Sequence, residues 1–142
     1  MTYSTSIMKI KNDLKSLKEY ELVLYGSYLD ENFIQYRSDI DIAVITRSKI
    51  HQTNINLWRD LLGKIPSQYD VKIFELLPLF VQIRIINSYR IIFGNSLKIS
   101  EYFYKFRKLW KDMIFRFESN QFKGIEEKIN GIERRKRLIQ NR

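Results

Sequence analysis

The 142-residue sequence contains no cysteine, and its single histidine is His51. The absence of cysteine excludes disulfide bonds and thiolate chemistry, and one imidazole cannot by itself form a histidine-rich metal site. Any metal ion that this chain binds would therefore be held by oxygen ligands.

Long apolar runs are absent as well. No stretch approaches the roughly 20 apolar residues that span a bilayer, and the opening MTYSTSIMKIKNDL lacks the charged-then-apolar layout of a signal peptide. We therefore expect a soluble, intracellular protein in the cytoplasm. No Pro/Gly/Ser-rich linker or internal repeat divides the chain, and its length suits one compact unit with a helical appendage.

Positive charge accumulates towards the C-terminus. Residues 1–50 hold seven basic and seven acidic residues, residues 51–100 hold six and three, and residues 101–142 hold twelve and six. Such an asymmetry can mark a surface for an anionic partner, nucleic acid or nucleotide, or it can be a solvated helix rich in lysine and arginine.

The pattern of apolar residues predicts alternating helices and strands. Helices are expected at 6–18, at 54–62 and after Pro78, and residues 28–36 are expected to form a short helix or loop. Strands are expected at 20–25, 39–46, 69–76 and 89–94. This order predicts an α/β (α+β) fold, in which helices flank a mixed sheet of about four strands.

The last third of the chain is different in character. Aromatic and apolar residues recur at helical spacing over 103–117, ESNQ interrupts the pattern at 118–121, and apolar residues resume from 122 to 132. The interruption predicts two helices that form a hairpin. We expect a domain at 1–96 and a helical extension at 97–142, which either packs on that domain or serves in oligomerisation or partner binding.

Two carboxylates open the second predicted strand. Strand side chains alternate between faces, so Asp39 and Asp41 are expected on one face and Ile40 on the other. Two neighbouring carboxylates repel each other unless a cation lies between them, and hard oxygen ligands favour Mg²⁺ over Zn²⁺. Alternatively, Asp39 caps a turn and Asp41 pairs with a lysine or arginine.

A Gly-Ser pair follows the first predicted strand. Gly26 allows backbone N–H groups to approach a bound group closely, and Ser27 adds a hydroxyl where a helix is expected to begin, a position that favours phosphate. An ordinary turn followed by a helix cap would have the same sequence.

A third acid, Asp70, opens the third predicted strand. If that strand lies beside the second, Asp70 joins Asp39 and Asp41 at one edge, as metal-assisted phosphoryl chemistry requires. Asp70 can also be a plain residue at the start of a strand, and Glu75 is then the reserve candidate. Arg37 could contact a phosphate or be an exposed loop residue.

The ordered combination of these motifs resembles the minimal nucleotidyltransferases of the DNA polymerase β superfamily. The resemblance covers roughly residues 20–95 and rests on three motifs, which are Leu24-Tyr25-Gly26-Ser27, Ser38-Asp39-Ile40-Asp41 and Asp70-Val71. The chain departs from the usual pattern between the first two motifs. Eleven residues separate Ser27 from Asp39 where ten are commonest, and YLDENF replaces the usual Ala-Arg-Gly.

The resemblance implies a nucleotidyltransferase fold and a Mg²⁺-dependent transfer of a nucleoside monophosphate, AMP from ATP, to a hydroxyl group. It implies that Asp39 and Asp41 bind one or two Mg²⁺ ions and that Asp70, a further ligand, orients or deprotonates the acceptor hydroxyl. The nucleotide would be bound by Gly26, Ser27 and Ser38.

Many proteins of this type act as antitoxins beside a HEPN-domain toxin, some by adenylylating a tyrosine of that partner. A HEPN partner of this chain would be a separate molecule, and the C-terminal helices could be its docking surface or a homodimer seam. Two other hypotheses remain, which are an inactive module that only binds nucleotide or a partner, and a nucleic-acid-binding protein whose support is the C-terminal charge alone.

Overall fold

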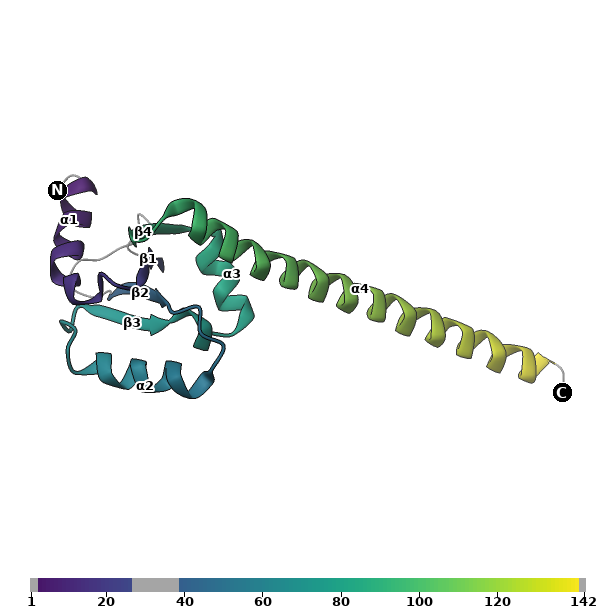
Figure 1. The fold of residues 1–142 in the computed structure, drawn as a ribbon. Coiled ribbons are helices and arrows are strands. Elements are labelled where there is room, and N and C mark those ends of the chain that lie inside the picture. Colours follow the sequence, from purple (N-terminus) through teal and green to yellow (C-terminus); the bar gives the residue numbers. More distant parts are fainter. Residues whose placement is uncertain (1–2, 27–38, 141–142) are drawn as a thin grey trace. The chain divides into compact units, whose positions relative to one another are not determined.

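The computed structural model describes residues 3–26 and 39–140. The chain divides into two compact units, Met1–Arg107 and Lys108–Arg142. Within the first unit, helices flank a sheet (Figure 1).

The helices and strands follow the predicted order closely. The elements before the last helix are α1 (Tyr3–Asp13), η1 (Lys15–Leu17), β1 (Glu21–Tyr25), β2 (Ile40–Ile45), α2 (His51–Leu62), β3 (Tyr69–Ile73), η3 (Phe74–Leu76), α3 (Leu79–Asn87) and β4 (Tyr89–Phe93). The predicted short helix or loop at 28–36 lies outside the described residues. Among the residues that the structure describes, no helix has both the length and the apolar character needed to cross a membrane.

The four strands form one mixed sheet in the order β3-β2-β1-β4. Strand β1 pairs antiparallel with both β2 and β4, whereas β2 and β3 run parallel. The predicted fold class, a mixed sheet of four strands with flanking helices, is thus confirmed. The parallel pair brings the beginnings of β2 and β3 to the same end of the sheet, next to the end of β1.

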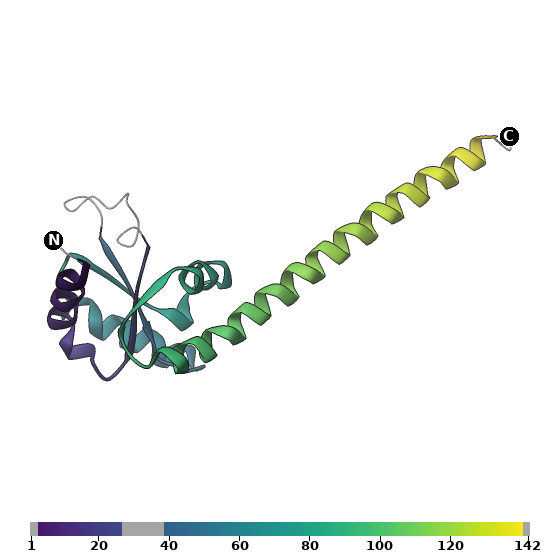
Figure 2. The ribbon, with the colours of Figure 1, turned by 90° about the horizontal axis from the view of Figure 1, so that it is seen from above.

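The two central strands, β1 and β2, are buried on both faces over most of their length because their residues there are apolar on both faces. On one face, Leu24, Ile42 and Val44 pack in a core with Ile10 and Leu14 from the N-terminal segment. Strand alternation directs Val23 and Ala43, both fully buried, to the other face. Helices α1 and α3 lie on opposite sides of the sheet (Figure 2).

The predicted C-terminal hairpin is wrong. A single helix, α4, extends over Ser96–Gln140 without a turn at residues 118–121. The sequence ESNQ contains no proline or glycine to end a helix, and polar residues are tolerated on a solvated helix surface. The polar stretch therefore interrupts the apolar stripe of α4 and leaves its backbone helical.

Candidate active site

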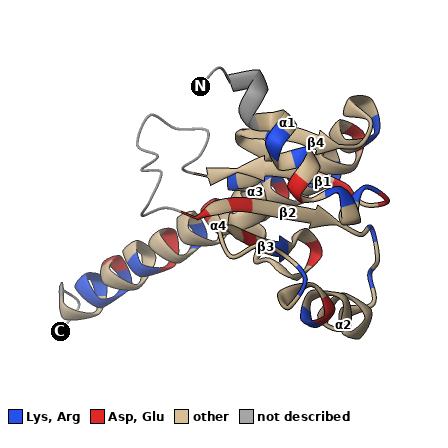
Figure 3. Cartoon of the chain, turned by 90° about the vertical axis from the view of Figure 1, so that its left-hand side faces the viewer, with Lys and Arg blue, Asp and Glu red and all other residues tan. Residues whose placement is uncertain are grey.

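The sheet has an acidic end where β1 stops and where β2 and β3 begin. Asp41 of β2 is the register partner of Tyr25 in β1 and of Asp70 in β3. Register partners on adjacent strands direct their side chains to the same face of a sheet, so these three side chains form a row. In Figure 3, where acidic residues are red, red marks the beginning of β2.

The remaining predicted acid, Asp39, immediately precedes β2 and is exposed, whereas Asp41 and Asp70 are half-buried. The pKa of the Asp41 carboxyl is raised, first by burial and then by the negative charge of Asp70, with a smaller contribution from Asp39. The positive charge of Lys72 opposes this rise. The charges of Asp70 and Asp39 therefore both act on Asp41, and a cation bound beside these acids would relieve the repulsion.

Gly26, directly after β1, lies against the carboxylate of Asp41. Its φ angle is +79°, in the region that residues with a side chain rarely adopt. A Cβ atom at this position would collide with Oδ2 of Asp41. The sequence predicted a close backbone approach at this glycine, and the structure shows the Asp41 side chain as the group that the backbone approaches. The predicted nucleotide-binding residues Ser27 and Ser38, like Arg37, lie outside the described residues.

Two neighbours of the acids were not anticipated from the sequence. The ammonium group of Lys72 lies 3.6 Å from Oδ2 of Asp70, two residues earlier on the same face of β3. The Tyr25 residue is half-buried, and the pKa of its hydroxyl is raised, first by burial and then by the charges of Asp41 and Asp70. The Asp-Val-Lys spacing could have indicated the first contact, because residues i and i+2 of a strand share a face.

Glu75 does not join the acidic end of the sheet. Its carboxylate accepts hydrogen bonds from the backbone N–H groups of Thr46 and Arg47, at 3.0 and 3.1 Å, and from the Tyr102 hydroxyl at 2.7 Å. Thr46 follows the last residue of β2, so this network lies at the strand end opposite to Asp41. As a reserve candidate for the acidic site, Glu75 was a wrong prediction.

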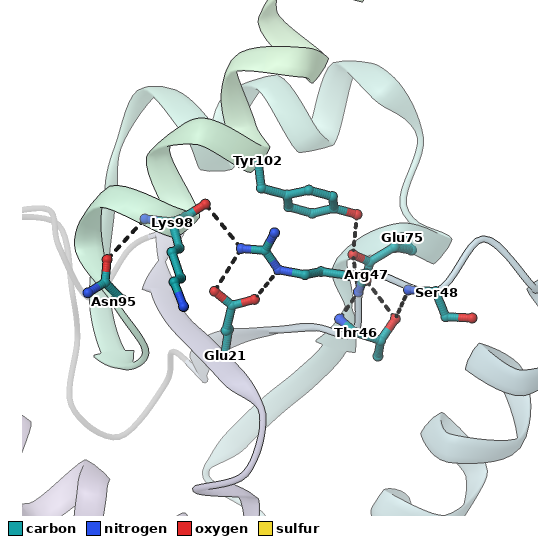
Figure 4. Close-up of polar contacts among 8 residues, drawn as sticks. All are labelled: Glu21, Thr46, Arg47, Ser48, Glu75, Asn95, Lys98 and Tyr102. Atoms are coloured by element: carbon teal, nitrogen blue, oxygen red, sulfur yellow. Dashed lines mark hydrogen bonds and ion pairs between the residues drawn. The ribbon is translucent and has the colours of Figure 1, made fainter.

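The network around Glu75 attaches the first turns of α4 to the sheet (Figure 4). The guanidinium of Arg47 donates to both carboxylate oxygens of Glu21 and to the carbonyl oxygen of Lys98, and it lies 4.7 Å from the centre of the Tyr102 ring. All these groups are paired with one another, which assigns the cluster a structural role.

A cavity of 440 Å³ lies apart from the row of acids, between α2 and the β3–η3 segment. Its lining is mainly apolar but includes basic residues, and consists of His51, Ile55, Trp58, Arg59, Lys72, Ile73, Leu76 and Leu77. The indole N–H of Trp58 donates to the carbonyl oxygen of Val71 at 3.2 Å. None of the predicted site residues that the structure describes lines this cavity.

The three acids at this end of the sheet offer carboxylate oxygens as candidate ligands for a cation. Within residues 3–26 and 39–140, no group of three or more histidine, cysteine, aspartate or glutamate residues is already placed to hold a metal ion. In the described residues, the three acids are thus close enough for their charges to interact, but their carboxylates do not surround a common metal position.

Comparison with known proteins connects this geometry to a family. The family described as polymerase beta, nucleotidyltransferase matches residues 8–98, which include the sheet and the three acids. The chain belongs to this nucleotidyltransferase family. A curated relative from Methanocaldococcus jannaschii, named "Putative protein adenylyltransferase MJ1547", is 43% identical over 112 residues, which are 79% of this chain and 86% of the relative.

Solved structures share the nucleotidyltransferase fold of this chain at low sequence identity. A crystal structure of a toxin–antitoxin with AMP-PNP has a TM-score of 0.57 and 17% identity, and the match covers 72% of this chain and 88% of that one. A structure of a tri-AMPylated Shewanella oneidensis HEPN toxin in complex with an MNT antitoxin has a TM-score of 0.54 and 17% identity. The match covers 79% of this chain and 89% of that one.

Proposed function

We propose that this nucleotidyltransferase is an adenylyltransferase that moves AMP from ATP to a hydroxyl group of another molecule in a Mg²⁺-dependent reaction. The observation that carries the proposal is the pairing of Asp41 with Asp70 across the parallel strands β2 and β3, with Asp39 two residues before Asp41. In a family of nucleotidyltransferases, carboxylates grouped in this way have the chemistry needed to assemble a metal-bound triphosphate.

The residues at the acidic end of the sheet fit Mg²⁺. Carboxylate oxygens are its preferred protein ligands. Burial and then the charge of Asp70 raise the pKa of Asp41, and a divalent cation would offset both effects. Asp39, Asp41 and Asp70 would hold one or two ions. When bound, Mg²⁺ would supply positive charge for the triphosphate and for the charge that develops during transfer.

Residues of the chain itself would bind the triphosphate and activate the acceptor. Gly26, with Ser27 and Ser38, would bind the triphosphate through backbone N–H groups and hydroxyls. Asp70 would orient the acceptor hydroxyl and take its proton. The acceptor oxygen then forms a bond to the α-phosphorus of ATP while the bond from that phosphorus to the bridging oxygen breaks, and pyrophosphate leaves with the electron pair.

The acceptor that we propose is a tyrosine hydroxyl of a HEPN-type toxin on a separate chain, so that this protein serves as an antitoxin. Two findings support this proposal. The curated relative is named as a protein adenylyltransferase, and a structural neighbour contains an AMPylated HEPN toxin beside an MNT antitoxin. Residues 1–96 would form the catalytic domain and residues 97–142 an extension for oligomerisation or partner binding.

A transfer assay tests this function. The full chain is mixed with ATP labelled at the α-phosphate, Mg²⁺ and a co-purified partner, and the label is located by peptide mass spectrometry. We expect label on a partner tyrosine, lost when Mg²⁺ is chelated. Absence of label on every acceptor, or transfer that is unchanged after Asp39→Ala, would refute the enzymatic function.

A second candidate is a nucleotide-binding or partner-binding module without catalysis. The ion pair between Lys72 and Asp70 favours it, because a lysine already compensates part of the negative charge that would attract a metal. Calorimetry with Mg²⁺-ATP, run beside the transfer assay, separates the two candidates: a pure binder takes up nucleotide and transfers nothing.

A further inference from the structure

The unit formed by residues 108–142 exposes a regular row of large apolar side chains. Phe122, Ile125, Ile129 and Ile132 are 63%, 57%, 51% and 54% exposed, and Ile139 continues the row at 73%. Their spacing alternates between three and four residues, with Lys136 at the one remaining position. This is the a and d pattern of a coiled coil, in which Phe122, Ile129 and Lys136 occupy a, and Ile125, Ile132 and Ile139 occupy d.

This row lies outside the residues that define the family. The family match ends at residue 98, whereas the row begins at Phe122. A function for the row is therefore independent of the nucleotidyltransferase site.

The glycines of this segment indicate that packing on another molecule stabilises it. Gly124 and Gly131 both lie inside α4, where glycine lowers helix stability, and an added Cβ atom would meet nothing within 4 Å at either position. No close approach among the described residues therefore requires them. Most helical stability in proteins comes from packing of an apolar face, and along this row that face is exposed.

The charges that flank the row specify how a second copy would pair. In this register Glu126 and Glu133 occupy e positions, and Gln121, Lys128 and Arg135 occupy g positions. In a parallel coiled coil, a g residue faces the e residue five positions later on the other helix. Lys128 then faces Glu133 of the second copy, and Gln121 faces Glu126, and each pairing occurs twice by symmetry.

An antiparallel arrangement has no such complementarity. It places e residues beside e residues and g residues beside g residues, so that glutamate would meet glutamate and Lys128 would meet Arg135 or another Lys128. Basic and acidic residues both recur along α4 (Figure 3). Their positions beside the apolar row match the parallel arrangement alone.

We propose that residues 122–139 form a parallel, two-stranded coiled coil with a second copy of this chain. Isoleucine at both a and d favours higher oligomers in general, but a lysine at one a position is tolerated where its ammonium group can reach water at the edge of a two-stranded seam. Lys136 therefore selects two strands and fixes the register.

The first test is the mass of the full chain in solution by sedimentation equilibrium. We expect a dimer, and Ile129→Asp in the seam should shift it to monomer. Leu138→Asp is the matched control, because Leu138 is also exposed, at 69%, but occupies position c, which faces away from the seam. A monomeric or trimeric wild-type chain, or equal behaviour of the two variants, overturns the proposal.

The second test uses charge and does not depend on the apolar residues. Glu133→Lys places a lysine opposite Lys128 in both symmetric pairings and should weaken dimerisation on the order of tenfold. Glu127→Lys makes the same charge change at the outward f position and should leave the dissociation constant unchanged. Adding Lys128→Glu to Glu133→Lys should restore dimerisation, and failure of that rescue argues against parallel pairing.

Cysteine cross-linking tests the orientation. The chain contains no cysteine, so a single introduced thiol reports on its own position. At an a position of a parallel pair the two thiols face each other, so Lys136→Cys should form a disulfide-linked dimer under mild oxidation, while Leu138→Cys should not. Cross-linking at 138 alone, or at neither position, contradicts the parallel seam.

Discussion

Lys72 and Asp70 lie on the same face of strand β3, with the lysine ammonium 3.6 Å from a carboxylate oxygen of the aspartate. The pair is partly exposed, so its own contribution to stability is small. Its importance lies in its position, because Asp70 is also the register partner of Asp41.

Replacement of Lys72 should strengthen cation binding. In Lys72→Met the aspartates lose a compensating positive charge, so the affinity for Mg²⁺ should rise by about two- to fivefold, as expected for a partly screened charge. Calorimetric titration with Mg²⁺ measures the change. Lys64→Met, which removes an exposed lysine after α2, is the control and should have no effect. Equal affinities in the wild type and Lys72→Met would show that the acids do not bind the ion.

Substitution of Gly26 should damage both stability and transfer. Gly26→Ala introduces a Cβ atom that collides with Oδ2 of Asp41 at a φ of +79°, and a strained backbone of this kind costs about 1–3 kcal/mol. Urea unfolding measures the loss. Gly63→Ala is the matched control, because Gly63 has a φ of −93° and open space around an added Cβ. If both variants unfold at the same urea concentration, the predicted collision is absent.

Removal of the Glu75 carboxylate should destabilise the fold without direct effect on the chemistry. Glu75→Ala leaves the N–H groups of Thr46 and Arg47 and the Tyr102 hydroxyl without their acceptor, which should cost about 2–3 kcal/mol. Glu101→Ala, at an exposed position of α4, should be neutral. Thermal unfolding and the transfer rate at a temperature well below the midpoint check both parts. A lower rate in the folded variant would place Glu75 in the reaction.

Asp39 should show the opposite behaviour. Asp39 is exposed, so Asp39→Ala should leave the unfolding midpoint unchanged while it lowers AMP transfer by about a hundredfold or more, as loss of a metal ligand would. Asp60→Ala removes an exposed aspartate on α2 and should retain full transfer. A loss of stability in Asp39→Ala that matches its loss of transfer would indicate a structural role.

Local patterns were sufficient to predict most of the fold. The β-branched run at 39–46 predicted β2, and the alternation of apolar and charged residues from Tyr69 predicted β3, although β3 ends at Ile73 and continues as the short helix η3. The three acids were predicted because each stands at or next to the start of a strand. Their adjacency also required the parallel pairing of β2 with β3, which depends on contacts distant in sequence.

Long-range contacts explain what the sequence did not reveal. Glu75 resembled a site acid in sequence, but its partners Thr46 and Tyr102 are 29 and 27 residues away. The continuity of α4 was missed for a different reason. A break in an apolar stripe shows that the surroundings of the helix change there. The helix itself ends only where its backbone hydrogen bonds end.

The hydrogen bond from the Trp58 indole to the carbonyl oxygen of Val71 has a consequence for solubility. Strand β3 is an edge strand of the sheet. The unpaired backbone groups of an edge strand can pair with a strand from another molecule and begin aggregation. One carbonyl of this edge strand already accepts a hydrogen bond from the indole of α2, and the charged Lys72 lies beside it. The edge is therefore a poor template for further strands.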